Sequence, residues 1–201
     1  MEFVGDWLRR LRKMPLHYRK DDFMRRTKYR PAYVHLAASL LKRLEFQTVI
    51  DIGCGNGFLL EHLVKAGKTA RGVELSPEVR DTIPPHLGAL IDIADFAQTS
   101  GQYDLVCCIE MAEHLVPARS AELVRTICAR ARLWVYFSAA PPGQWGRGHM
   151  NCRPYKDWIN MFDAAGWTCD LDITRQIRDD LKQLPVAPWL RRNGLVFSRI
   201  P

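Results

Sequence analysis

At 201 residues the chain has the length of one α/β domain, enough to bury a hydrophobic core without disulfides or metals. Its hydrophobic fraction of 47% and charged fraction of 25% are ordinary for a globular protein and exclude a wholly disordered or fibrous chain. No apolar run approaches the roughly 18 residues that span a bilayer, and the N-terminus lacks the layout of a signal peptide. The six cysteines form no CxxC pair. We therefore expect a cytoplasmic protein with reduced thiols and no membrane span.

The net charge of +7 is concentrated at the N-terminus. Residues 1–30 contain ten Lys or Arg and four Asp or Glu, which gives this segment a charge of +6 (10 − 4). Apolar residues at helical spacing predict one helix over residues 3–11 and another over 31–44. We expect residues 1–45 to form a basic helical extension that closes over the site as a lid or docks an acidic partner. A solvated helical face is the alternative.

From residue 48 onward, short apolar runs alternate with helical stretches. Strands are predicted at 48–52, 69–74, 88–91, 104–109 and 132–137, with helices beginning after Ser76 and at Pro117. A helix over 155–165 is followed by an extended segment at 167–174 and a last strand at 194–200, which together would add a hairpin to the sheet edge. This order predicts a doubly wound α/β domain over residues 46–201 with a mostly parallel sheet.

The first predicted strand runs directly into a glycine-rich turn at residues 53–57, and a helical pattern begins at Phe58. Such a turn lets a ligand lie against bare main chain at a helix N-terminus. A dinucleotide fingerprint needs G-x-G-x-x-G, but Phe58 stands where the third glycine belongs. Asp51 disfavours a pyrophosphate and suits the cationic methionine part of S-adenosylmethionine, while Glu74 can accept hydrogen bonds from both ribose hydroxyls. The sequence therefore predicts S-adenosylmethionine as cofactor.

The segments 49–57, 72–76 and 103–115, together with Asp92, resemble the successive motifs of class I S-adenosylmethionine-dependent methyltransferases over about residues 46–170. The resemblance implies a Rossmann-like, seven-stranded methyltransferase fold with the cofactor over the carboxyl ends of the strands. Carried over by position, it implies contacts to the methionine moiety, ribose and adenine from Asp51, Gly53, Gly55, Gly57, Glu74, Leu75, Asp92, Ile93 and Glu110. The family often has Gly-Asp-Ala where this chain has Ile91-Asp92-Ile93, so a simple strand-end turn is the alternative for Asp92.

Methyl transfer from a sulfonium is an in-line displacement, so positioning supplies much of the catalysis and a base is optional. For a hydroxyl or a protonated amine, histidine is the natural proton acceptor. His149 lies in a glycine-rich loop after the fifth predicted strand, and we predict it as the general base. The alternative is that it caps the next helix or bonds within its loop.

Several further side chains fall near this predicted acceptor site. The candidate substrate-binding residues are His114, Trp145, Asn151, Arg153, Tyr29 and Tyr33, the two tyrosines coming from the basic extension. Arg153 and its neighbour Arg147 would suit a carboxylate or phosphate, with solvent exposure as the alternative. No group of His, Cys or carboxylates has metal-ligand spacing, so no metal is expected.

The leading hypothesis is a methyltransferase acting on a small molecule through an oxygen or nitrogen atom, acidic acceptors included. One alternative is the same reaction on a macromolecule, with the basic arm binding RNA or an acidic carrier protein. Another is a non-catalytic cofactor-binding subunit. The glycine spacing disfavours a nicotinamide oxidoreductase. The identity of the acceptor and the oligomeric state do not follow from the sequence.

Overall fold

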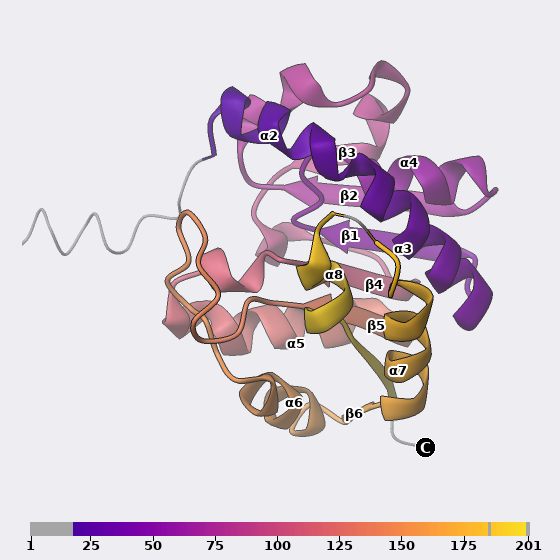
Figure 1. Ribbon diagram of the computed structural model, residues 1–201, viewed down its shortest axis with the longest axis vertical. Helices are drawn as coiled ribbons and strands as arrows, with labels where there is room; N and C mark the ends of the chain where they lie inside the picture. The colour runs from indigo at the N-terminus through magenta and orange to yellow at the C-terminus, as the bar shows by residue number, and fades with distance from the viewer. Residues whose placement is uncertain (1–17, 185, 200–201) are drawn as a thin grey trace, which may run out of the picture.

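The computed structural model describes residues 18–184 and 186–199, and within them one sheet holds seven strands in the order β3-β2-β1-β4-β5-β7-β6 (Figure 1). Strands β1 to β5 pair in parallel, whereas β7 runs antiparallel to both β5 and β6. The predicted mostly parallel, doubly wound α/β fold is confirmed. In chain order the strands are β1 Thr48–Ile52, β2 Thr69–Glu74, β3 Ile91–Ile93, β4 Tyr103–Ile109, β5 Ala131–Ser138, β6 Trp167–Cys169 and β7 Leu195–Arg199.

Helices cover both faces of this sheet (Figure 1). One face carries α3 (Arg30–Arg43), α4 (Phe58–Lys65), α7 (Leu171–Asp180) and α8 (Pro188–Asn193). The other face carries α5 (Ser120–Arg130) and α6 (Tyr155–Asp163). A further short helix, α2 (Lys20–Arg26), lies beyond the carboxyl ends of the strands. Within the described ranges, no helix combines the length and the apolar character needed to cross a membrane.

The central strands contribute side chains to both cores because successive residues point to opposite faces. On β1, Val49 packs with α3 and α4, whereas Ile50 and Ile52 pack with α5 and α6. On β4, Leu105 packs on the face of α3 and α4, and Val106 packs on the face of α5 and α6. This burial on both faces explains why these strands read as continuous apolar runs rather than as alternating patterns.

Two elements between β2 and β4 differ from the sequence predictions. The third strand begins at Ile91, because residues 85–90 form 3₁₀ turns that open with Pro85. The chain after Ser76 forms the 3₁₀ helix η2 (Pro77–Thr82) rather than an α-helix, and the Ser76 side chain makes no capping hydrogen bond. Pro77 fits the first turn of a helix, as predicted, but the helical segment ends at Thr82 and is short, as 3₁₀ helices usually are.

The last two strands pair with each other at one edge of the sheet, as predicted, but helices lie between them in the chain where an extended segment was expected. Strands β6 and β7 pair antiparallel, although α7 and α8 separate them in the chain. Residues 171–174, predicted as extended, form the first turn of α7. Asp170 is the N-cap of this helix, and its carboxylate accepts a hydrogen bond from the backbone N–H of Ile173 at 2.8 Å.

The described part of the N-terminal extension is joined to the catalytic domain through a shared core. The helix predicted over 31–44 is confirmed as α3, and its Leu36 and Leu40 are completely buried. Arg30 forms an ion pair of 2.6 Å with Glu61 of α4. The helix predicted over 3–11 lies outside the described residues. α3 shares its core with α4 and β1 and so packs as part of the α/β domain. The division of the chain at residue 45 stays a prediction.

Candidate functional site

The glycine turn between β1 and α4 forms the floor of the site. Gly53, Gly55 and Gly57 have φ angles of 79°, 52° and 74°, a left-handed conformation that favours glycine. A Cβ atom on Gly53 would lie 2.5 Å from Cγ of Met111, so the turn also has no room for a side chain there. Gly57 is the N-cap of α4. The backbone is therefore open to a ligand at the carboxyl end of β1.

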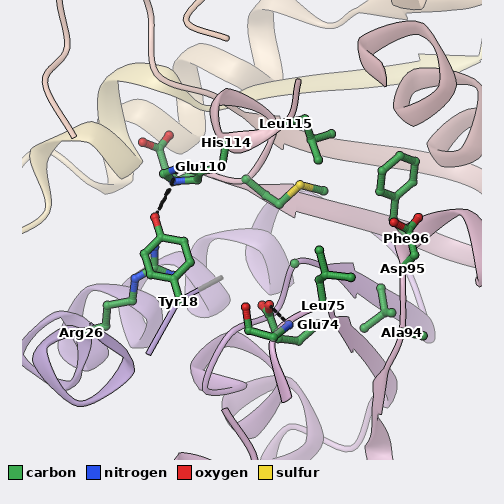
Figure 2. A pocket seen from close by; sticks show the side chains of 14 residues that line it. Tyr18, Arg26, Glu74, Leu75, Ala94, Asp95, Phe96, Glu110, His114 and Leu115 are labelled. Atoms are coloured by element: carbon green, nitrogen blue, oxygen red, sulfur yellow. Dashed lines mark hydrogen bonds between the residues drawn. The ribbon is translucent and has the colours of Figure 1, made fainter. Parts of the chain in front are cut away.

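Glu74 at the end of β2 supports this turn and remains able to bind a ligand. Its two carboxylate oxygens accept hydrogen bonds from the backbone N–H groups of Gly55 (3.1 Å) and Ser76 (3.0 Å). Each oxygen keeps a second lone pair, which suits two neighbouring hydroxyl groups such as those of a ribose. Figure 2 shows Glu74 and Leu75 along one wall of the pocket above the turn.

Asp51 carries a buried carboxylate whose charge is not balanced by a described side chain. It is 3% exposed, and its Oδ1 atom has no hydrogen-bond partner among the described residues. Burial, with a smaller effect from Glu74, raises the pKa of Asp51 to about 7. A buried, unpartnered carboxylate oxygen at this point fits a ligand that brings a cationic group, as the methionine part of S-adenosylmethionine does.

Two adjoining cavities lie above the turn. The inner pocket has mainly apolar walls, formed by residues such as Val73, Leu75, Ala94, Phe96, Met111 and Leu115 (Figure 2). The outer pocket has a volume of about 510 Å³. Both pockets are lined by Gly53, Glu110 and His114. The two cavities therefore meet at the carboxyl ends of β1 and β4.

The residues predicted to hold the adenine lie at the edge of this arrangement. Asp92 is 63% exposed in its side chain and pairs with Arg71 at 3.1 Å instead of lining either cavity. The next turn, which includes Asp95 and Phe96, lines the inner pocket and was missed from the sequence. Asp95 accepts two hydrogen bonds from Arg119, at 2.6 and 2.7 Å. The apolar inner pocket at this end fits a planar base.

Glu110 follows β4 and is held in a strained turn by a hydrogen-bond network. Its φ angle is 50°, unusual for a residue with a side chain, and its backbone N–H bonds to the Ser138 carbonyl at 3.0 Å. The carboxylate accepts hydrogen bonds from Asn193 (3.0 Å) and Gln144 (3.2 Å). Burial raises the pKa of Glu110. Neither amide was identified from the sequence, because both are distant from Glu110 in the chain.

The structure brings His114 and His149 together in the lining of the outer pocket. Their rings meet edge to face with centroids 4.9 Å apart. Nδ1 of His149 lies 2.9 Å from the carbonyl oxygen of Gln144, an acceptor, so in the neutral imidazole this nitrogen carries the proton and Nε2 has the free lone pair. The pKa of His114 falls to about 4, mainly through burial.

Glu113 lies directly behind these histidines and was missed as a site residue. Its side chain is completely buried, and neither carboxylate oxygen has a hydrogen-bond partner in the described part of the chain. Oε1 is 4.0 Å from Nε2 of His149. Burial and the neighbouring Glu110 raise the pKa of Glu113 well above its ordinary value. The Glu113 backbone carbonyl accepts hydrogen bonds from the N–H groups of Met150 and Asn151, which fix the His149 loop in place.

The other predicted substrate residues divide into two groups. Tyr29, Tyr33 and Trp145 line the outer pocket, with Trp145 97% exposed at its rim. Asn151 and Arg153 lie behind the loop instead. The Asn151 amide donates to the Ala112 carbonyl and the Ser120 hydroxyl, and Arg153 donates to the Asn151 side chain at 2.8 Å. Their hydrogen bonds hold the loop in place, and neither residue lines the two cavities, so their substrate contacts stay a prediction.

The described part of the basic extension reaches over the pockets. The Tyr18 hydroxyl lies 3.0 Å from Nε2 of His114, and the Arg26 guanidinium stacks 4.5 Å above the Tyr18 ring (Figure 2). Asp22 of α2 forms an ion pair with Arg147 of the His149 loop. α2 and the loop therefore meet beside the outer pocket, and the action of the extension as a lid stays a prediction.

The strand order, the glycine turn at β1 and the acidic residue at the end of β2 together define a class I S-adenosylmethionine-dependent methyltransferase. The family model of the methyltransferase domain matches residues 24–171, and the chain belongs to this family. Its cofactor is S-adenosylmethionine, as the sequence predicted.

Curated relatives and solved structures agree with this assignment. The chain is 36% identical over 104 residues to the ubiquinone biosynthesis O-methyltransferase of Hydrogenovibrio crunogenus, covering 47% of this chain and 43% of the relative. It is 33% identical over 123 residues to that of Paraburkholderia phytofirmans, covering 56% and 49%. The chain thus spans about half the length of these relatives.

The fold is also found in solved structures with low sequence identity. A sugar N-methyltransferase from Streptoalloteichus sp. ATCC 53650 aligns with a TM-score of 0.68 at 21% identity, covering 92% of this chain and 94% of that one. A magnesium protoporphyrin IX methyltransferase from Synechocystis PCC 6803 with bound S-adenosylmethionine aligns with a TM-score of 0.63 at 17% identity, covering 87% and 81%. At these identities the likeness shows the shared fold.

The raised pKa of Asp51 predicts a pH dependence of cofactor binding. The cationic ligand prefers the ionised carboxylate, so below pH 7, where Asp51 is protonated in the free protein, binding has to release a proton. Affinity for S-adenosylhomocysteine should weaken by up to about tenfold for each pH unit below 7 and level off above it. Calorimetric titrations from pH 5.5 to 8.5 test this. Asp51→Asn should bind more weakly, without that slope; equal slopes in both proteins would contradict the role of Asp51.

Proposed function

We propose that this chain transfers the methyl group of S-adenosylmethionine to a hydroxyl group of a small molecule. The observation that carries the proposal is the outer pocket of about 510 Å³, which meets the inner pocket at Gly53, Glu110 and His114. An acceptor in this pocket would lie beside the end of the cofactor that carries the methyl group. The names of the curated relatives, ubiquinone biosynthesis O-methyltransferases, support an oxygen acceptor.

The chain's residues would act mainly by positioning. S-adenosylmethionine, when bound, supplies an electrophilic methyl group on a sulfonium. The glycine turn, Asp51 and Glu74 would hold the cofactor, and the network of Asn193 and Gln144 would keep Glu110 in place beside it. In-line transfer needs the acceptor oxygen, the methyl carbon and the sulfur to be aligned, so a rigid floor and a shaped pocket supply much of the rate.

The walls of the outer pocket favour an acceptor with an aromatic or apolar body. Tyr29, Tyr33, Phe58 and Trp189 line it, and the rings of Tyr29 and Trp189 meet edge to face at 4.9 Å. Aromatic side chains bind flat apolar groups well. A phenol-type hydroxyl would also lose its proton more easily than an alcohol, and that proton would be released near Nε2 of His149.

The lid favours a small acceptor over a macromolecule. The Asp22–Arg147 ion pair joins α2 to the His149 loop across the outer pocket, and the Tyr18 hydroxyl bonds to the Arg147 carbonyl at 3.3 Å. An acceptor held beneath these contacts is enclosed on several sides. Two of the three basic side chains of α2 are engaged within the chain: Lys20 pairs with Asp81 at 3.1 Å, and Arg26 stacks on the Tyr18 ring.

The test is methyl transfer from S-adenosylmethionine labelled in its methyl group. The purified chain is incubated with a panel of phenols, catechols, aliphatic alcohols and amines, and in parallel with RNA and acidic carrier proteins. We expect labelled ethers from aromatic hydroxyl acceptors. Labelling confined to RNA or a carrier protein would favour the macromolecular alternative. Binding of S-adenosylhomocysteine without transfer to any acceptor would favour a non-catalytic subunit.

A further inference from the structure

Three side chains with metal-binding atoms converge where the two pockets meet. One carboxylate oxygen of Glu113 and one ring nitrogen each of His114 and His149 lie within 4.8 Å of one another. The sequence predicted no metal because these residues show no ligand spacing along the chain. The fold brings them together by placing the turn after β4 beside the loop after β5.

The Glu113 carboxylate lies in an environment that favours a bound cation. It is 0% exposed, and both oxygens are without a hydrogen-bond partner within the described ranges. A buried, unpaired carboxylate is costly, and proteins normally offset that cost with a cation or with hydrogen bonds. The guanidinium of Arg26, a nearby protein cation, is stacked 4.5 Å above the Tyr18 ring.

The two histidines are oriented as metal ligands are. Metal-binding histidine commonly donates its second ring N–H to a carbonyl or carboxylate, which fixes the tautomer and aims the free nitrogen at the metal. His149 has this arrangement, because its Nδ1 bonds to the Gln144 carbonyl at 2.9 Å while Nε2 faces Glu113. The Tyr18 hydroxyl lies 3.0 Å from Nε2 and 3.3 Å from Nδ1 of His114, so His114 would offer one of these nitrogens to an ion and keep the other toward that hydroxyl.

The distances also fit an ion. The 4.0 Å between Oε1 of Glu113 and Nε2 of His149 is within the span of two bonds of about 2.1 Å each. All three ligand atoms lie within 4.8 Å of one another, so a side-chain shift of about half an ångström is the most that any pair needs to meet the same limit. No backbone rearrangement is needed, because the Glu113 carbonyl already anchors the His149 loop.

We infer that Glu113, His114 and His149 bind a divalent transition-metal ion, of the class of Mn²⁺, Co²⁺ or Zn²⁺, at the base of the acceptor pocket. Two imidazoles and one carboxylate form a ligand set that suits these ions better than Mg²⁺ and leaves coordination positions open. The open positions face the outer pocket, which His114 and His149 line. The role of the ion in methyl transfer rests on the proposed function, which supplies the acceptor hydroxyl. The metal site itself does not depend on it.

With such an ion bound, His149 would act as a metal ligand and not as the general base. Its Nε2 lone pair would bind the ion, and the acceptor hydroxyl, bound at an open position, would lose its proton to solvent more readily. The oxygen lone pair then forms the bond to the methyl carbon as the carbon–sulfur bond breaks. The electron pair of that bond stays on sulfur, which becomes the neutral thioether of S-adenosylhomocysteine.

The experiment measures Mn²⁺ binding to the chelator-treated full chain by electron paramagnetic resonance and calorimetry, and follows the visible spectrum of added Co²⁺. We expect one site per chain and a rise in melting temperature with the ion. Glu113→Gln and His149→Ala should weaken Mn²⁺ binding by more than about tenfold. His35→Ala, an exposed histidine on α3, is the matched control and should bind like the wild type.

The outcomes separate this inference from the proposed function. Full methyl transfer by chelator-treated protein, with no binding of Mn²⁺, Co²⁺ or Zn²⁺ at millimolar concentration, would overturn the metal site and leave the function standing. Ion binding that is lost in both variants, in a protein with no methyl transfer, would support the site and overturn the function. Ion binding unchanged in folded His149→Ala protein would also overturn the site, whatever the behaviour of Glu113→Gln.

Discussion

Replacing His149 by alanine is expected to lower turnover with the acceptor by about 10²–10⁴-fold, whether His149 binds an ion that promotes loss of the acceptor proton or takes that proton itself. Affinity for S-adenosylhomocysteine should stay close to that of the wild type, because His149 lines the outer pocket and not the inner one. Steady-state kinetics and calorimetry on the same preparation check the two expectations. A folded variant with wild-type turnover would show that alignment alone carries the reaction.

The same variant separates the two roles of His149. If its nitrogen binds an ion, chelation should lower wild-type turnover as strongly as the substitution does, and should have no further effect on His149→Ala. If His149 is itself the base, chelation should leave the wild type unchanged and the substitution should remove one limb of the pH–rate profile. The exposed His35→Ala variant should behave like the wild type in every measurement.

Replacing Glu74 by alanine is expected to weaken S-adenosylhomocysteine binding by about 1–3 kcal/mol, a factor of roughly 5 to 150 in the dissociation constant. The substitution removes the carboxylate proposed to receive the ribose hydroxyls. It also leaves the N–H groups of Gly55 and Ser76 without the acceptor that holds the turn. Calorimetric titration of the folded variant measures the loss.

Two further variants make this result specific. Glu74→Gln keeps the size and one acceptor oxygen, so it should lose less affinity than Glu74→Ala. Glu78→Ala changes an exposed carboxylate in η2 a few residues along the chain and should bind like the wild type. Unchanged affinity in folded Glu74→Ala protein would reject the ribose contact.

The sequence predicted the fold and the floor of the site because both depend on local patterns. The strand, turn and helix at residues 48–65 are contiguous, and each glycine of the turn has a positive φ that the pattern implied. Glu74 was found because it ends the neighbouring parallel strand. Asp92 lines neither cavity, because its side chain lies in solvent on the short strand β3 and pairs with Arg71, so its contact to adenine stays a prediction.

Other parts of the site depend on contacts that no local pattern reveals. Asn193 is 83 residues from Glu110, to which it bonds, and nothing near Asn193 in the sequence marks it. Glu113 is not marked by any local pattern, because its burial arises from the loop packed over it. Asn151 was predicted to bind substrate because it is a polar residue in the loop after β5. In the structure its side-chain amide donates a hydrogen bond to the Ser120 hydroxyl. The structure alone distinguishes these cases.

The most direct test of the central claim is calorimetric titration of the full chain at pH 8 with S-adenosylhomocysteine and, separately, with NADH. The glycine spacing, the buried Asp51 carboxylate and the apolar inner pocket predict saturable binding of one S-adenosylhomocysteine per chain and no binding of NADH. Tight binding of NADH by a protein that does not bind S-adenosylhomocysteine would contradict the cofactor assignment and, with it, the proposed methyl transfer.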